Sequence, residues 1–213
     1  MKFNRNMLLL YAVTDRRRTG VGDFDAQVQA ALRGGITMLQ LREKEMSDAL
    51  LLEEALRMKK HAHAYGVPLI VNDRWDIAWQ AGADGVHVGI EDAPVSEIRQ
   101  RVSTDFIIGS TCKTVEQAKV AETAGADYMG VGAIFPSPTK TNAVRITNAQ
   151  LREIVSSVSI PAVAIGGISY DNVCEIKGSS VSGVAVVSAI LGAENIEKAT
   201  ALLKERVKAV VEE

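Results

Sequence analysis

Ala81-Gly82-Ala83-Asp84-Gly85-Val86 recurs 43 residues further on as Ala124-Gly125-Ala126-Asp127-Tyr128-Met129. In each copy the glycine suits the left-handed turn that ends a helix, and the Ala-Asp pair leads into an apolar run typical of a strand. A unit of one strand and one helix recurs at about this distance. The repeat therefore indicates a chain built of consecutive strand–helix units.

Outward from this repeat, eight short apolar runs alternate with eight helical patterns. The predicted strands are Leu8–Val13, Met38–Arg42, Pro68–Val71, Gly85–Val88, Ile107–Gly109, Tyr128–Gly132, Ala162–Ile165 and Gly183–Val187. The predicted helices are Asp25–Arg33, Asp48–Tyr65, Ile77–Ala81, Val95–Arg101, Val115–Ala124, Asn148–Val155, Asn172–Lys177 and Ile196–Val211. Strict alternation is typical of a parallel sheet, and eight units favour a closed (β/α)8 TIM barrel over an open doubly wound sheet.

Length and composition agree with a single barrel domain spanning residues 1–213, because 213 residues leave little room for a second domain. The hydrophobic share of 47% with only 5% aromatic residues predicts an aliphatic core. A net charge of −2 gives no overall attraction to nucleic acid or to an anionic membrane. We therefore expect small-molecule partners, with any anionic ligand held by local cations.

The two cysteines, Cys112 and Cys174, have no metal-ligand spacing and fit a reduced compartment. The sequence has neither a signal-peptide pattern nor an apolar stretch of membrane-spanning length. These features predict a soluble, cytoplasmic protein without a membrane partner. The oligomeric state is left open, a homo-oligomer included.

Glycines and small residues follow the last two predicted strands. Gly166-Gly167 and Val187-Ser188 stand where barrels commonly bind phosphate through backbone N–H groups. A Gly-Gly pair alone serves a turn equally well. Two such sites at adjacent strand ends favour phosphate binding.

Acidic and amide side chains follow the third and fourth predicted strands. Asn72, Asp73 and Asp92 offer oxygen ligands of the kind that Mg²⁺ takes, together with waters and substrate phosphates. A single Asp at such a position more often caps a helix. Their coincidence at adjacent strand ends predicts a Mg²⁺ site, whereas Glu91 is assigned to solvent.

Cations follow the second and sixth predicted strands. Arg42 presents a fork to phosphate oxygens, and Lys44 and Lys140 offer point charges that can stabilise a leaving group. Lys140 ends the stretch Pro136–Lys140, whose prolines restrict the backbone and whose hydroxyls add donors. This stretch is interpreted as a loop that meets an anion, and Arg16–Arg18 as solvated cations.

No residue is assigned as a nucleophile or a base. His87 alternates with Val86 and Val88 in a predicted buried strand, which favours a hydrogen-bonded core histidine over a catalytic base. Cys112 lies near the predicted rim, but no histidine follows it to activate a thiolate.

With these residues in place, the chain resembles the thiamine phosphate synthase family over nearly its whole length. The matching segments, in order, are Gln40-Leu41-Arg42-Glu43-Lys44, Val71-Asn72-Asp73, Gly85–Gly89 with Glu91-Asp92, Gly130–Lys140, Ile165–Ile168 and Val186–Ile190. Two segments depart from the family pattern. Thr111-Cys112-Lys113-Thr114 stands where the family usually has Ser-Thr-His-Thr, and Lys177–Gly183 lacks the usual Gly-Ala-Asp-Gly entry into the last strand.

The resemblance implies a reaction and a set of site residues. The implied reaction joins 4-amino-2-methyl-5-pyrimidinylmethyl diphosphate to a thiazole phosphate and releases pyrophosphate. If the thiazole is carboxylated, CO₂ is also lost. The aminopyrimidine diphosphate would be held by Gln40, Leu41, Arg42, Glu43, Lys44, Asn72 and Lys140, with Thr111 able to bond the diphosphate. The thiazole phosphate would be held by Ser137, Pro138, Thr139, Gly167, Val187 and Ser188. Mg²⁺ would be bound by Asp73 and Asp92.

The implied mechanism is a dissociative displacement without a protein nucleophile. Mg²⁺, Arg42, Lys44 and Lys140 would neutralise the departing pyrophosphate, and the thiazole nitrogen would then attack the pyrimidinylmethyl cation. A thiazole tautomerase on the same barrel would need neither the Mg²⁺ carboxylates nor the diphosphate lysines. A sugar-phosphate isomerase is permitted by the fold alone. A non-catalytic sensor of thiamine precursors lacks support from any appended domain or partner motif.

Overall fold

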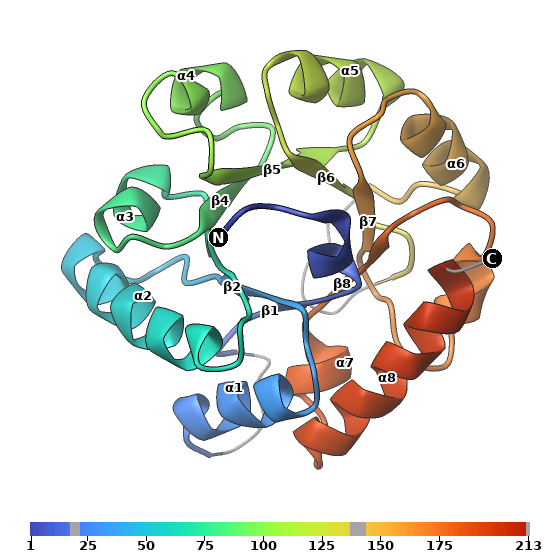
Figure 1. The fold of residues 1–213 in the computed structure, drawn as a ribbon. Coiled ribbons are helices and arrows are strands. Elements are labelled where there is room, and N and C mark those ends of the chain that lie inside the picture. The colour runs from blue at the N-terminus through green and yellow to red at the C-terminus, as the bar shows by residue number, and fades with distance from the viewer. Residues whose placement is uncertain (18–21, 137–143, 212–213) are drawn as a thin grey trace.

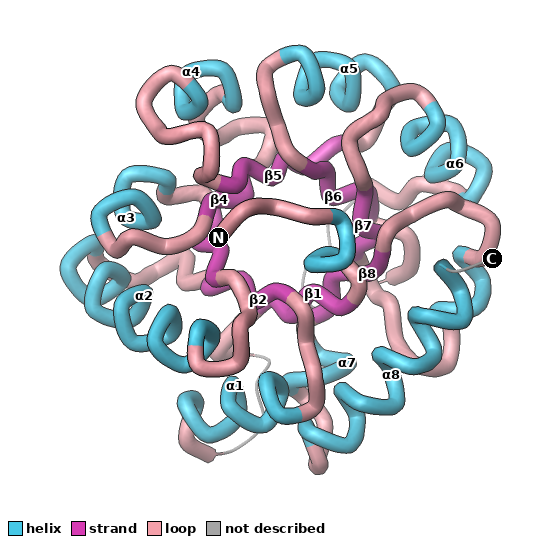
Figure 2. Tube along the Cα trace, viewed as in Figure 1, coloured by secondary structure: helices cyan, strands magenta, loops and turns pink. Residues whose placement is uncertain are grey.

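The structure is a computed structural model that describes residues 1–17, 22–136 and 144–211. Its eight parallel strands pair in sequence order, and β8 pairs with β1 to close the barrel. The helices form a ring outside the strands, as Figures 1 and 2 show down the barrel axis. The predicted (β/α)8 barrel is confirmed.

The elements follow the predicted order with small shifts at their ends. The strands are β1 Leu10–Val13, β2 Met38–Leu41, β3 Leu69–Asn72, β4 Gly85–Val88, β5 Ile107–Cys112, β6 Tyr128–Gly132, β7 Ala162–Ile165 and β8 Gly183–Val186. The α-helices are α1 Phe24–Arg33, α2 Asp48–His63, α3 Trp75–Gln80, α4 Val95–Arg99, α5 Val115–Thr123, α6 Asn148–Ser156, α7 Ser188–Leu191 and α8 Ile196–Val211.

Three short elements differ from the expectation. The helix predicted over Asn172–Lys177 is a single 3₁₀ turn, η2, over Val173–Ile176. A second 3₁₀ turn, η1 over Arg5–Leu8, and the short helix α7 were not predicted. Elements of about one turn carry too few apolar positions for a periodic signal.

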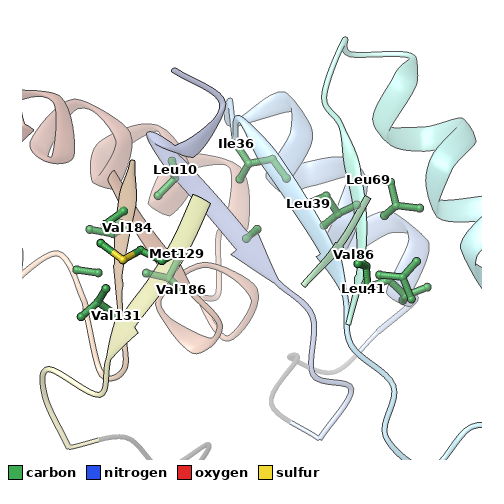
Figure 3. Close-up of a cluster of buried hydrophobic side chains, with 14 of the residues drawn as sticks. Leu10, Ile36, Leu39, Leu41, Leu69, Val86, Met129, Val131, Val184 and Val186 are labelled. Atoms are coloured by element: carbon green, nitrogen blue, oxygen red, sulfur yellow. The ribbon is translucent and has the colours of Figure 1, made fainter. Parts of the chain in front are cut away.

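Most strand residues are buried on both faces, because helices cover the outer side of each strand and other strands face its inner side. The half-buried ones, Asn72, Ser110, Thr111 and Ile165, lie at or near the ends of their strands. The outward residues pack with the helices in one large cluster, and Figure 3 shows Leu39, Leu69 and Val184 among them. The inward residues form a second cluster that includes Met38 and Ile70. The barrel interior is therefore a packed core, as expected for eight strands.

The chain before β1 crosses the end of the barrel at which the strands begin (Figure 1). Leu8 is fully buried in the interior cluster, and Phe3 and Met7 pack against it. The ring of Phe3 stacks on Tyr128, with 5.9 Å between the ring centroids. This end of the barrel is thus closed, and the opposite rim remains for chemistry. No helix within the described ranges is both long and apolar enough to cross a membrane.

Glycines allow strands to approach neighbouring backbone closely. A Cβ on Gly85 would lie 2.1 Å from the carbonyl oxygen of Ile107, and one on Gly183 would lie 2.0 Å from that of Leu8. Contacts this short require the backbone to move. These two positions therefore need glycine for space rather than for an unusual φ angle.

We expect Gly85→Ala to lower the free energy of unfolding by about 1–3 kcal/mol, because the added methyl group must displace the β5 backbone. Urea unfolding followed by circular dichroism measures the change. Gly66→Asn is the control, since Gly66 has φ +69° with open space around its Cβ, and asparagine tolerates that angle. Equal stability of Gly85→Ala and the native protein would contradict the packing argument.

Candidate active site

The segments that follow β1 and β2 are joined by hydrogen bonds at the open rim. The Thr14 N–H donates to the Gln40 carbonyl oxygen at 2.9 Å, and the Arg42 N–H donates to Thr14 Oγ1 at 2.9 Å. Both bonds involve the main chain of the Gln40–Lys44 segment. The backbone at Gln40 and Arg42 is therefore held by the segment after β1.

A buried carboxylate orients Arg42. Arg42 Nη1 donates to Asp15 Oδ2 at 3.2 Å, and the Asp15 side chain is only 4% exposed. The other oxygen, Oδ1, accepts the Arg17 N–H at 3.1 Å. Asp15 therefore holds the guanidinium of Arg42 by one edge and leaves its remaining donors for an anion.

Arg16 and Arg17 are exposed, as expected of solvated cations, but both also form ion pairs. Arg16 pairs with Glu43 at 2.9 Å and with Glu54 at 2.8 Å, and Arg17 pairs with Asp15 at 3.4 Å. Burial is the main reason that the pKa of Glu43 is raised, and Arg16 opposes that shift. The partners of Arg16 lie on the next strand–helix unit, so the sequence alone does not reveal these pairs. Arg18 lies outside the described residues.

Two carboxylates meet where β3 and β4 end. Asp73 adopts a φ of 62°, and its N–H donates to the His87 carbonyl oxygen at 2.8 Å. Asp92 Oδ2 accepts the Gly89 N–H at 2.6 Å. The Asp92 and Asn72 side chains lie within hydrogen-bonding reach of the Asp73 carboxylate. The predicted grouping of these three oxygen-bearing side chains is present.

The carboxylate pair favours a shared proton or a cation. Burial, followed by the hydrogen bond and the charge of Asp92, raises the pKa of Asp73 to about 6. Lys44 opposes the shift, with Nζ 3.8 Å from Asp73 Oδ2. No group of three or more Asp, Glu, His or Cys side chains that could hold a metal occurs in the described part of the chain. Two carboxylates fit Mg²⁺, which takes its remaining ligands from water and from substrate phosphates.

The glycines after β7 form a fixed turn. Gly166 and Gly167 have φ angles of 100° and 66°, and a Cβ on Gly167 would lie 2.3 Å from the Pro136 carbonyl oxygen. Asn172 Nδ2 donates to the Gly167 carbonyl oxygen at 2.9 Å, and its Oδ1 accepts the Ser169 N–H at 2.8 Å. The side chain of Asn172 therefore holds the turn through two hydrogen bonds.

The other predicted phosphate contacts follow β8. Val187 precedes α7, which begins at Ser188. The first N–H groups of a helix have no acceptor within it and can bind an anion. The predicted loop residues Ser137, Pro138, Thr139 and Lys140 lie outside the described residues, so their roles stay predictions.

The interior beneath the rim is polar. Gln40 Nε2 donates to Tyr11 Oη at 2.6 Å, and the Tyr11 and Tyr128 hydroxyls lie 2.9 Å apart. His87 Nδ1 lies 3.1 Å from Tyr128 Oη, and Nε2 lies 3.1 Å from Thr111 Oγ1. The prediction that His87 is a hydrogen-bonded core residue is confirmed. Burial lowers its pKa to about 4, so the ring is neutral near pH 7.

Several residues are less available than the sequence suggested. Leu41 is fully buried among the outer core residues, so only its backbone can contact a ligand. Burial raises the pKa of the Cys112 thiol to about 11, in agreement with its exclusion as a nucleophile. Lys113 donates its N–H to Gln117 at the start of α5.

Asp15, Tyr11 and Tyr128 were missed as functional residues. The strand pattern marks the tyrosines as core residues, yet their hydroxyls face the polar interior and need partners. A tyrosine at an inward strand position was the available signal. Asp15 resembles an ordinary turn residue until its burial and its contact with Arg42 are known.

The fold and the rim define an enzyme that acts on phosphorylated small molecules. The family model described as "Thiamine monophosphate synthase" matches residues 10–190, which include all eight strands. The chain belongs to this family.

Similar proteins bear related names. A protein of Alkaliphilus oremlandii named thiamine-phosphate synthase is 46% identical over 98% of this chain and 100% of its own length. Thiamine-phosphate synthase 2 of Streptococcus pneumoniae serotype 4 is 43% identical, covering 95% and 97% of the two chains. The solved structure of thiamine phosphate pyrophosphorylase from Pyrococcus furiosus matches with a TM-score of 0.89 and 40% identity, covering 97% of this chain and 98% of the other.

We expect Asp73→Asn to stabilise the metal-free protein at pH 8 by about 1–2 kcal/mol and to have little effect at pH 4. The folded protein raises the pKa of Asp73 from 3.8 to about 6, so ionisation costs stability as the pH rises through this range. Urea unfolding in a chelator at both pH values measures the difference. Asp76→Asn is the control, because Arg74 lowers the pKa of Asp76 and its loss should destabilise. Destabilisation by Asp73→Asn at pH 8 would contradict the crowding of the two carboxylates.

We expect Asp15→Asn to lower the free energy of unfolding by about 2–4 kcal/mol, because it leaves Arg42 without its buried counter-charge. The exposed partner of Arg17, Glu45, provides the matched control, since its side chain is 85% exposed. Glu45→Gln should change stability by less than about 0.5 kcal/mol. Similar losses for both variants in urea unfolding would show that the burial of Asp15 has no special weight.

Proposed function

We propose how this chain, a transferase of the thiamine phosphate synthase family, carries out its reaction. The substrates are 4-amino-2-methyl-5-pyrimidinylmethyl diphosphate and a thiazole phosphate, and the products are thiamine phosphate and pyrophosphate. The observation that carries the proposal is the group of Arg42, Lys44, Asp73 and Asp92 at the ends of adjacent strands. Such a group suits a diphosphate leaving group, because the cations would bind its oxygens and the carboxylates would bind Mg²⁺.

The protein's part in bond breaking is electrostatic. As the C–O bond to the diphosphate breaks, negative charge grows on the leaving oxygen, and the donors of Arg42 and Lys44 would stabilise it. Lys140 is proposed to add a third positive charge. Mg²⁺ at Asp73 and Asp92 would supply further positive charge to the diphosphate oxygens.

Bond formation requires that the two substrates be held close together. The thiazole phosphate is proposed to bind at Gly167, Val187 and Ser188, with Ser137-Pro138-Thr139 completing its site. The thiazole nitrogen then donates its electron pair to the methylene carbon of the pyrimidinylmethyl cation. Positioning of this kind can supply several kcal/mol of the barrier reduction, and no protein nucleophile is needed.

Competing functions are less well supported. A tautomerase would have no use for the carboxylate pair with Lys44 beside it, and a binding sensor would not need groups that stabilise a leaving diphosphate. The similar proteins reported above carry synthase or pyrophosphorylase names. A cytoplasmic location and a homo-oligomeric state remain proposals.

The direct test is to incubate the purified protein with both substrates and to measure thiamine phosphate and pyrophosphate together. We expect equal amounts of the two products with Mg²⁺ and neither product with a chelator. Pyrophosphate without thiamine phosphate would indicate hydrolysis instead. No product from the folded protein in Mg²⁺ would contradict the proposed function.

We expect Lys44→Gln to lower kcat by roughly a hundredfold, because one cation at the leaving group is lost. Lys60→Gln, which removes an exposed lysine from α2, should leave kcat within about twofold of the native value. Steady-state kinetics with saturating thiazole phosphate measure both variants. A native kcat in Lys44→Gln would remove this lysine from the mechanism.

A further inference from the structure

A chain of hydrogen bonds crosses the barrel interior and joins two of the predicted substrate contacts. It runs from Gln40 on β2 through Tyr11, Tyr128 and His87 to Thr111 on β5, with separations of 2.6, 2.9, 3.1 and 3.1 Å. The first four residues are buried, and Thr111 is half-buried at the rim. This series of hydrogen bonds thus connects the interior to the open end of the barrel.

The donors and acceptors along this chain can be assigned in order. Gln40 Nε2 has no acceptor capacity, so Tyr11 Oη accepts a hydrogen bond from it. The Tyr11 hydroxyl in turn donates a hydrogen bond to Tyr128 Oη. Tyr128 then donates to His87 Nδ1, because its buried hydroxyl proton has no other acceptor among the described residues. A neutral imidazole with Nδ1 as acceptor carries its proton on Nε2 and donates to Thr111 Oγ1.

This order determines what the two ends offer to a ligand. Thr111 Oγ1 accepts from His87, so its own hydroxyl proton is available to donate toward the rim. At the other end the Gln40 amide uses Nε2 for Tyr11, and within the described ranges no residue donates to its Oε1. Thr111 therefore presents a donor and Gln40 an acceptor.

The opposite order would reverse both ends. Gln40 would accept from Tyr11 through Oε1 and present its NH₂ group, and Thr111 would donate to His87 and present only lone pairs. Lone pairs facing a diphosphate oxygen are repulsive, whereas a hydroxyl proton is attractive. An anion at Thr111 therefore selects the order in which Gln40 presents an acceptor.

Gly109, Phe3 and the burial of the tyrosines support this series of hydrogen bonds. A Cβ on Gly109 would lie 2.2 Å from Tyr128 Cζ and 2.5 Å from His87 Nδ1, so this glycine makes room for the contact. Phe3 stacks on Tyr128 from the closed end of the barrel. Burial also raises the pKa of both tyrosines, which keeps their hydroxyl protons in place.

We propose that this chain of hydrogen bonds couples diphosphate binding at Thr111 to recognition of the pyrimidine 4-amino group by Gln40, with Tyr128 as a positioning residue. The inference rests on the proposed function, which supplies both ligand groups. A 4-amino group donates to Gln40 Oε1, whereas a 4-oxo group at the same place would oppose one acceptor with another. Such a mismatch at a buried polar group is a strong basis for specificity.

The first test compares binding of the 4-amino substrate with that of its 4-oxo analogue as a competitive inhibitor. We expect the native protein to prefer the amino compound by about a hundredfold and Tyr128→Phe by less than about tenfold, because Tyr11 can then donate to a reversed Gln40 amide. The KM for thiazole phosphate should stay within about twofold. Tyr65→Phe, at an exposed tyrosine, should keep the native preference. An unchanged preference in Tyr128→Phe would overturn the proposal.

The second test uses the native protein alone and does not depend on turnover. Nitrogen-15 NMR of the native protein, with inorganic pyrophosphate and Mg²⁺ as the probe, reports which nitrogen of His87 carries the proton. We expect the Nε2–H form, and the Nδ1–H form or an imidazolium would overturn the proposal. Absence of turnover by the native protein would instead count against the proposed function, so the two failures are distinguishable.

Discussion

The hydrogen bonds between β1 and β8 close the sheet, with Leu10 opposite Val184 and Ala12 opposite Val186. Closure brings the ends of all eight strands to one rim, where residues from distant parts of the sequence become neighbours. Asp15 after β1 reaches Arg42 after β2 because these two strands pair side by side. The N-terminal segment covers the other end of the barrel (Figure 1), so ligands have one open face.

The second constraint is the repulsion between two carboxylates at that rim, which positive charge relieves. Asp73 and Asp92 lie close enough to share a proton, and the pKa of Asp73 is raised to about 6. Lys44 relieves part of this repulsion at 3.8 Å, and a divalent cation would relieve the rest. The carboxylate pair thus costs some stability without a ligand, and under the proposed function this cost favours binding of metal and diphosphate.

The fold and the grouping of Asn72, Asp73 and Asp92 could be predicted because both depend on local sequence. Short apolar runs with turn residues after them place the eight strands, and the polar residues that follow them lie at the rim. The contacts of Arg16 with Glu43 and Glu54 could not be predicted, since they depend on which loops meet in space. The same holds for the hydrogen bonds of Tyr11 and Tyr128, whose residues lie 117 positions apart. Helix α7 is too short to leave a periodic pattern.

A crystal structure of the protein with Mg²⁺, pyrophosphate and thiamine phosphate is the most direct test of this account. We expect the metal to be bound by Asp73 and Asp92, and the pyrophosphate to contact Arg42, Lys44 and Thr111. The phosphate of thiamine phosphate should lie against Gly167 and Ser188. Ligands bound elsewhere, or a metal that contacts neither carboxylate, would contradict the assignment of the rim as the catalytic site.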